Sequence, residues 1–195
     1  MKNRKLIVPL LALGLVAMGA VQLFAAVTES STNVPLAIPD NGNVNSTLNF
    51  SVNGTMTDAN LTVNITHTWN ADLRLTLNSP TVAAQILWQN CGQSGDNLTN
   101  TVIDNDAAGL SPCTFAAQPF TGSFQPTFAT QGATPNPTAA SGSMNSFDGT
   151  MSGGVWTLNV ADDSSICTGT LNAWSLTLDG PPPLPVELMN FEIGS

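Results

Sequence analysis

Basic side chains are almost absent from this chain of 195 residues, which carries 4 Lys and Arg against 13 Asp and Glu and a formal net charge of −9. Three of the four basic residues lie within the first five positions, and only Arg74 follows them. An acidic surface of this kind repels phosphate backbones, so the composition excludes nucleic-acid binding. It also excludes any mechanism that needs a lysine beyond Lys5.

The usual groups for general acid–base catalysis are also scarce. The chain has no tyrosine and a single histidine, His67. Charged residues make up 9% of the sequence, well below the roughly 25% of ordinary soluble domains. Carboxylates, amides and hydroxyls are the side chains that remain available for binding or chemistry.

The N-terminus has the three parts of a secretory signal peptide. Three basic residues precede an apolar run from Leu6 to about Ala20, and small residues stand at Gly19, Ala20, Ala25 and Ala26. This order predicts a signal peptide over residues 1–26 and a secreted protein, either extracellular or periplasmic. The alternative is an uncleaved membrane anchor, which needs about 20 apolar residues, whereas Gln22 interrupts this run. We expect no membrane span after cleavage.

Export would place the three cysteines in an oxidising compartment, where one disulfide is plausible. Cys91 and Cys113 bracket a stretch rich in Gly, Asn and Asp that is typical of a long loop. A bridge between them would restrain that loop, so we expect this pair and leave Cys167 unpaired. The alternative is that all three are free or buried thiols.

The hydrophobic pattern is that of strands. Apolar residues alternate from Val44 to Val52 and stop at Asn53-Gly54, a dipeptide that predicts a tight hairpin turn. No segment has sustained helical spacing. Short alternating segments separated by turn residues favour a β-sandwich or jelly roll, and further segments of this kind lie at residues 61–65, 73–77, 86–88, 156–160 and 174–178.

Two segments fall outside this pattern. Residues 130–146 are small and polar, and we expect a mobile excursion there. Residues 181–195 open with three prolines and are typical of a linker or tail.

Several motifs follow one another in a recognisable order. They are Ile38 to Gly42 (IPDNG), Val63 to Leu77 (VNITHTWNADLRLTL), Ser79-Pro80, Phe147 to Gly149 (FDG), Gly154 to Asp163 (GVWTLNVADD) and Gly169 to Leu176 (GTLNAWSL). Over residues 36–180 the chain resembles the P domain, also called the Homo B domain, of subtilisin-like and kexin-like serine proteases. The resemblance implies an all-β, galactose-binding-like jelly roll of about eight antiparallel strands. It further implies a module that folds with, caps and stabilises a protease domain, often with bound calcium, and that does no catalysis itself.

Two acidic segments are candidate calcium sites. Calcium takes six to eight oxygen ligands from carboxylates, amides and backbone carbonyls, and few basic residues are present to compensate clustered carboxylates. Asp and Asn are also ordinary turn residues, so solvated loops are the alternative. The predicted ligands are Asp96, Asn100, Asp104 and Asp106 in one loop, and Asp162 and Asp163 after a later strand.

Two further motifs resemble parts of a hydrolase. His67 and Asp72 could belong to a triad, but His67 shares the strand parity of Leu61 and Val63, which directs it to the core. We therefore expect a structural hydrogen bond, with Asp72 as the candidate partner. Gly142-Ser143-Met144 resembles a nucleophile segment, yet no acid motif precedes it, so no complete triad is predicted.

Two functions from different classes remain open. The first is a secreted, calcium-stabilised, non-catalytic accessory module that assists the folding, stability or docking of a subtilisin-like serine endopeptidase. The second is a secreted surface or matrix protein that uses the same sandwich for adhesion, carbohydrate binding or self-assembly. The expected partner is accordingly a subtilisin-like protease or a cell-surface component.

Overall fold

A computed structural model describes residues 26–51, 53–114, 117–129 and 137–180. The predicted signal peptide, apart from Ala26, and the predicted tail at residues 181–195 lie outside these ranges. No helix within them has the length and apolar character needed to cross a membrane.

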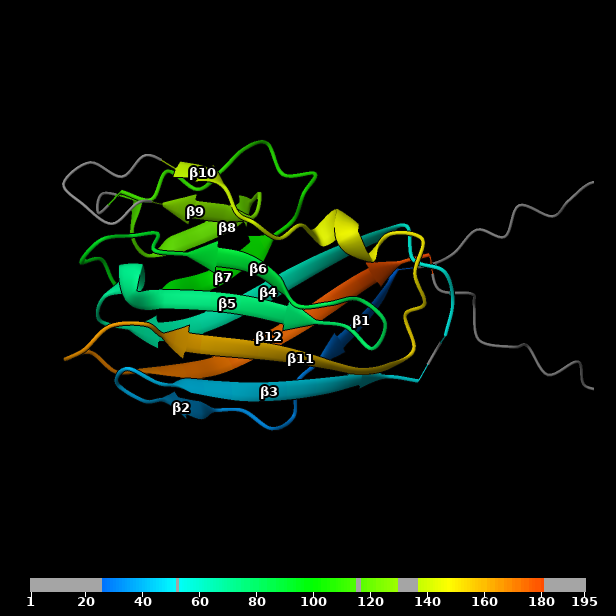
Figure 1. Ribbon diagram of the computed structural model, residues 1–195, viewed down its shortest axis with the longest axis horizontal. Coiled ribbons are helices and arrows are strands. Elements are labelled where there is room, and N and C mark those ends of the chain that lie inside the picture. The colour runs from blue at the N-terminus through cyan, green and yellow to red at the C-terminus, as the bar shows by residue number, and fades with distance from the viewer. Residues whose placement is uncertain (1–25, 52, 115–116, 130–136, 181–195) are drawn as a thin grey trace, which may run out of the picture.

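The described chain forms two six-stranded sheets that lie against each other as two layers (Figure 1). The first sheet follows the order β1-β12-β4-β7-β8, with β2 also paired to β12. Its members are β1 (Val27–Ser30), β2 (Leu36–Ile38), β4 (Asp58–His67), β7 (Leu98–Ile103), β8 (Phe120–Phe124) and β12 (Gly169–Asp179). Because β1 pairs with β12, the sandwich begins ahead of the predicted start at residue 36.

The second sheet follows the order β10-β9-β6-β5-β11-β3. Its members are β3 (Asn43–Phe50), β5 (Leu73–Asn78), β6 (Gln85–Gln89), β9 (Thr127–Ala129), β10 (Pro137–Ala139) and β11 (Gly154–Asp162). Most pairs are antiparallel, but β6 with β9 and β7 with β8 are parallel. The β-sandwich prediction is confirmed, whereas the expected set of about eight antiparallel strands is replaced by twelve strands in two mixed sheets within the described residues.

The strand alternation predicted from the sequence fills the core between the sheets. On β4 the buried positions include Leu61, Val63 and Ile65, each at most 1% exposed. On β11, Trp156 is fully buried, and its ring meets that of Phe147 edge-on at 5.0 Å between centroids. Burial of these apolar side chains supplies the main driving force for closing the two sheets together.

Two expectations about connections are wrong. Asn53-Gly54 is not a hairpin turn, because β3 pairs with β11 in one sheet and β4 pairs with β12 in the other, so the chain crosses between layers at this point. Residues 137–146 are not an irregular excursion, since they include β10 and the start of the 3₁₀ helix η3 (Met144–Phe147). Residues 130–136 lie outside the described residues.

Candidate functional site

Three carboxylates gather at one end of the sandwich. Asp58 begins β4, and Asp104 and Asp106 follow the end of β7. Because β7 pairs antiparallel with β4, all three residues lie at the same end of the sheet. One carboxylate oxygen from each lies within 4.8 Å of the others. We call these three residues the acidic cluster. The Asp106 amide donates to Asp104 Oδ1 at 2.7 Å, which fixes the turn that carries both side chains.

The electrostatics of this end are unfavourable without a counter-ion. Burial raises the pKa of Asp58 above its usual 3.8, and the charges of Asp104 and Asp106 raise it further, although hydrogen bonds from Ala59 and Asn60 oppose the shift. Burial also raises the pKa of nearby Asp148, with smaller contributions from Asp58 and Asp106. Asp58 and Asp148 therefore resist ionisation, mainly because they are partly buried and to a smaller extent because of the neighbouring carboxylates.

The structure divides the predicted calcium ligands. Asp104 and Asp106 join the acidic cluster, whereas Asp96 is exposed in the loop before β7 and is not a member. Asn100 is exposed on β7, and its backbone amide donates to Asn64 Oδ1 at 2.8 Å. Asp58 was missed by sequence reasoning because only strand pairing reveals its nearness to Asp104. The available signal is its place as the first residue of a strand.

His67 is buried at the opposite end of β4, as its strand parity predicted. Its hydrogen-bond partner is Asp162 and not Asp72, because Asp162 ends β11 and points inward, with His67 Nε2 3.2 Å from its Oδ2. Asp72 is a buried neighbour of this pair in η1 (Asn70–Asp72). Burial raises the pKa of Asp72, and the charge of Asp162 raises it further while His67 opposes the shift.

The second predicted calcium set, Asp162 and Asp163, is engaged by protein partners. Besides His67, Asp162 accepts the Ser164 amide through its Oδ1 at 3.0 Å. Asp163 receives a two-pronged ion pair from Arg74, with Nε 2.6 Å from Oδ2 and Nη2 2.9 Å from Oδ1. The Asp163 hydrogen bond raises the pKa of the Arg74 guanidinium. Within the described residues the structure thus places a cation or a histidine against each of these carboxylates.

The hydrolase-like motifs serve structural roles in this fold. His67 Nε2 faces Asp162, and its Nδ1 lies 2.9 Å from the Trp69 carbonyl oxygen and 3.2 Å from the Trp69 amide nitrogen. Both ring nitrogens are therefore occupied. Ser143 is the N-cap of η3, where its Oγ accepts the Asn145 amide and donates to Asn105 Oδ1 at 3.1 Å. No described contact joins Ser143 to His67.

Ser143→Ala tests this structural role. We expect a loss of about 1 kcal/mol in the free energy of unfolding, because the variant removes an N-cap. We expect no effect on proteolysis, because neither wild type nor variant should hydrolyse casein. Thermal melts and a casein assay measure the two effects. Casein turnover that the substitution abolishes would show that Ser143 is a nucleophile.

The structure joins Cys91 and Cys113 in a disulfide with an S–S distance of 2.05 Å. Both residues are fully buried, and the bridge ties the chain just after β6 to the segment ahead of β8. Cys167 is a half-buried free thiol in the loop between β11 and β12.

Comparison with known proteins identifies one family. The proprotein convertase P-domain model matches residues 56–178. No curated protein sequence matches the chain. Two solved structures are similar to it: the serine protease of Aeromonas sobria (TM-score 0.47, 17% identity, 80% of this chain and 27% of that one) and the same organism's serine protease in complex with its chaperone, ORF2 (TM-score 0.48, 18% identity, 82% and 27%). The chain therefore spans about a quarter of the length of these structures.

Proposed function

Because the chain belongs to the proprotein convertase P-domain family, we propose that it is a secreted, non-catalytic accessory module of a subtilisin-like serine endopeptidase. In this role it assists the folding, stability or docking of the protease domain. The family match over residues 56–178 is the observation that carries the proposal. The occupied nitrogens of His67 and the capping role of Ser143 support a module without catalytic function of its own.

A binding experiment tests the proposed partner. The exported chain is titrated into a panel of subtilisin-like catalytic domains expressed without P domains, and complex formation is followed by calorimetry and size-exclusion chromatography. We expect a one-to-one complex with at least one member and none with a chymotrypsin-like protease. Equal binding to both protease classes, or to neither, would contradict the proposal.

The acidic cluster is the part of this module that we propose to bind calcium. Calcium–oxygen distances are 2.3–2.6 Å, so oxygens on one ion lie within about 5 Å of one another, and the cluster oxygens lie within 4.8 Å. Asn60 offers a further oxygen ligand next to Asp58. Its Nδ2 donates a hydrogen bond to Asp58 Oδ2 at 2.7 Å, and its buried Oδ1 has no hydrogen-bond partner in the described part of the structure. The donor set fits a hard cation in chemistry and spacing. A bound ion would neutralise carboxylates that otherwise repel one another.

Asp58→Asn should change stability in opposite directions with and without calcium. In chelator at pH 7 the variant should melt higher than wild type, because it removes a half-buried charge beside Asp104 and Asp106. A raised folded-state pKa means that the folded state binds more protons, so this advantage should shrink as pH falls towards 3.8. In calcium at 100 times its Kd, wild type should gain about 5–10 °C and the variant little.

Asp96→Asn is the matched control for this experiment. Asp96 is exposed and lies outside the acidic cluster, so its replacement should leave the calcium response unchanged. A wild-type melting temperature that calcium does not alter would rule out the site. An equal loss of response in Asp58→Asn and Asp96→Asn would place the ion elsewhere.

A further inference from the structure

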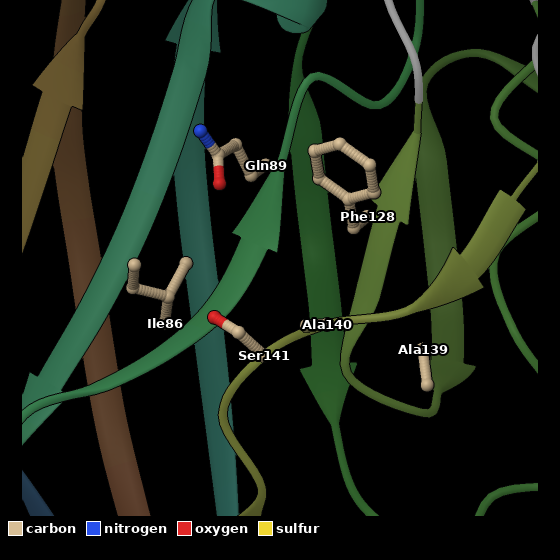
Figure 2. Close-up of a pocket in the computed structure, with 6 residues that line it drawn as sticks. All are labelled: Ile86, Gln89, Phe128, Ala139, Ala140 and Ser141. Atoms are coloured by element: carbon tan, nitrogen blue, oxygen red, sulfur yellow. The ribbon is translucent and has the colours of Figure 1, made fainter.

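A shallow pocket opens on the outer face of the second sheet, where β6, β9 and β10 meet (Figure 2). Its volume is about 270 Å³, slightly below the range of 300–1,000 Å³ usual for pockets that hold drug-sized ligands. None of the described side chains that line it is ionisable; they are Ile86, Gln89, Phe128, Ala139, Ala140 and Ser141.

A β-bulge on β6 brings Ile86 and Gln89 to the same face of the sheet. Ile86 pairs with Thr76 and Gln89 with Arg74, two positions on the same side of β5, whereas Trp88 pairs with the intervening Leu75. Simple alternation predicts that Ile86 and Trp88 lie on the same face of the sheet. The bulge inserts one unpaired residue between them, so their side chains lie on opposite faces. Trp88 is consequently buried in the core, and Ile86 faces outward with Gln89.

Phe128 completes this face from the neighbouring strand. The parallel pairing of β6 and β9 sets Phe128 directly beside Gln89. The Phe128 ring is half-buried and flanks the gap above β6 (Figure 2). The pocket thus has an apolar floor at Ile86 and an aromatic side wall.

The rim of the pocket is fixed to the sheet by its backbone. The Gly142 amide donates to the Ile86 carbonyl at 2.9 Å, and the Ala140 amide donates to the Pro126 carbonyl at 3.0 Å. A Cβ at Gly142 would come within 2.6 Å of the Ile86 backbone, so only glycine allows so close an approach. The segment that carries Ser141 is therefore held against β6 before any ligand arrives.

Two polar groups among the lining residues face the gap. The Gln89 amide oxygen and the Ser141 hydroxyl point towards the same space above Ile86 (Figure 2). Gln89 is half-buried and Ser141 is exposed, so both side chains are accessible to a ligand in the pocket. Together they offer donors and acceptors without charge, which is the capacity needed to bind hydroxyl groups.

We propose that this pocket binds one neutral sugar ring. A pyranose has an apolar C–H face that can lie against Phe128 and Ile86, and hydroxyls that can pair with Gln89 and Ser141. An acidic sugar fits less well, because no described residue of the lining is basic and the chain has a net charge of −9. This binding site shares no described residue with the acidic cluster and does not depend on association with a protease.

An NMR titration of the exported, isotope-labelled chain tests the proposal. The probes are the methyl glycosides of galactose, glucose and mannose, together with N-acetylglucosamine and glucuronate. We expect saturable shifts for at least one neutral sugar, confined to the amides of the pocket residues, and weaker binding of glucuronate. Phe128→Ala, Gln89→Ala and Ser141→Ala should each weaken that binding about tenfold, as expected when one good contact is lost.

Val155→Ala is the matched control, since it removes an apolar side chain that is 56% exposed elsewhere on the same sheet. It should bind the sugar like wild type. Gln89→Ala and Ser141→Ala truncate side chains outside the core, so they test the pocket even if Phe128→Ala unfolds. The proposal is overturned if no neutral sugar gives saturable shifts, or if binding survives both polar substitutions unchanged.

Discussion

Replacing Asp162 with alanine is expected to lower the free energy of unfolding by about 3–5 kcal/mol, the usual cost of removing one member of a buried pair. The side chains of Asp162 and His67 are both 0% exposed and lie 3.2 Å apart. The substitution leaves His67 Nε2 without its partner and also removes the acceptor of the Ser164 amide. Chemical denaturation measures the loss.

The adjacent carboxylate supplies a matched control for this prediction. Asp163 pairs with Arg74 at the surface, where both side chains are 32% exposed. Exposed ion pairs contribute about 0–1 kcal/mol, so Asp163→Ala should be mild. The two variants remove the same chemical group from consecutive positions and differ mainly in burial. Equal losses in both variants would contradict the structural role assigned to the His67–Asp162 pair.

The second large effect is expected from the disulfide. Cys91 and Cys113 are 22 positions apart, and closing a loop of that length stabilises the folded state by about 3 kcal/mol in the chain-entropy model. The double variant Cys91→Ala/Cys113→Ala should lose about that amount in urea denaturation. Reduction of the wild-type protein should bring its transition close to that of the variant.

Cys167→Ala is the control for the disulfide, because Cys167 is a half-buried free thiol outside the bridge. It should unfold at nearly the same urea concentration as wild type. If the double variant proves no less stable than Cys167→Ala, the bridge does not stabilise the domain.

Strand alternation predicted much of the fold because each strand has one face in the core. The positions of Leu61, Val63 and Ile65 follow from period-two spacing alone. The choice of partner strand does not, since pairing depends on contacts between distant segments. For this reason the sequence wrongly predicts a hairpin turn at Asn53-Gly54 and does not predict the bulge that turns Ile86 outward.

Unknown strand pairing also explains why the sequence predicts only some of the residues at the candidate sites. Spacing identified Asp104 and Asp106, which are close in sequence, but could not identify Asp58, which joins them only through the pairing of β4 with β7. Parity placed His67 in the core, but its partner Asp162 comes from the end of β11 and not from nearby Asp72. The sequence predicts clusters of residues that are close along the chain and the face on which a strand residue lies. It does not predict contacts between distant strands.

We propose that this P domain acts on a subtilisin-like protease. The most direct measurement is the half-life of proteolytic activity at elevated temperature for a subtilisin-like catalytic domain that binds the chain, with and without an equimolar amount of it. We predict a half-life at least severalfold longer with the wild-type chain and no gain with the destabilised Asp162→Ala variant. A half-life unchanged by the wild-type chain would contradict the claim.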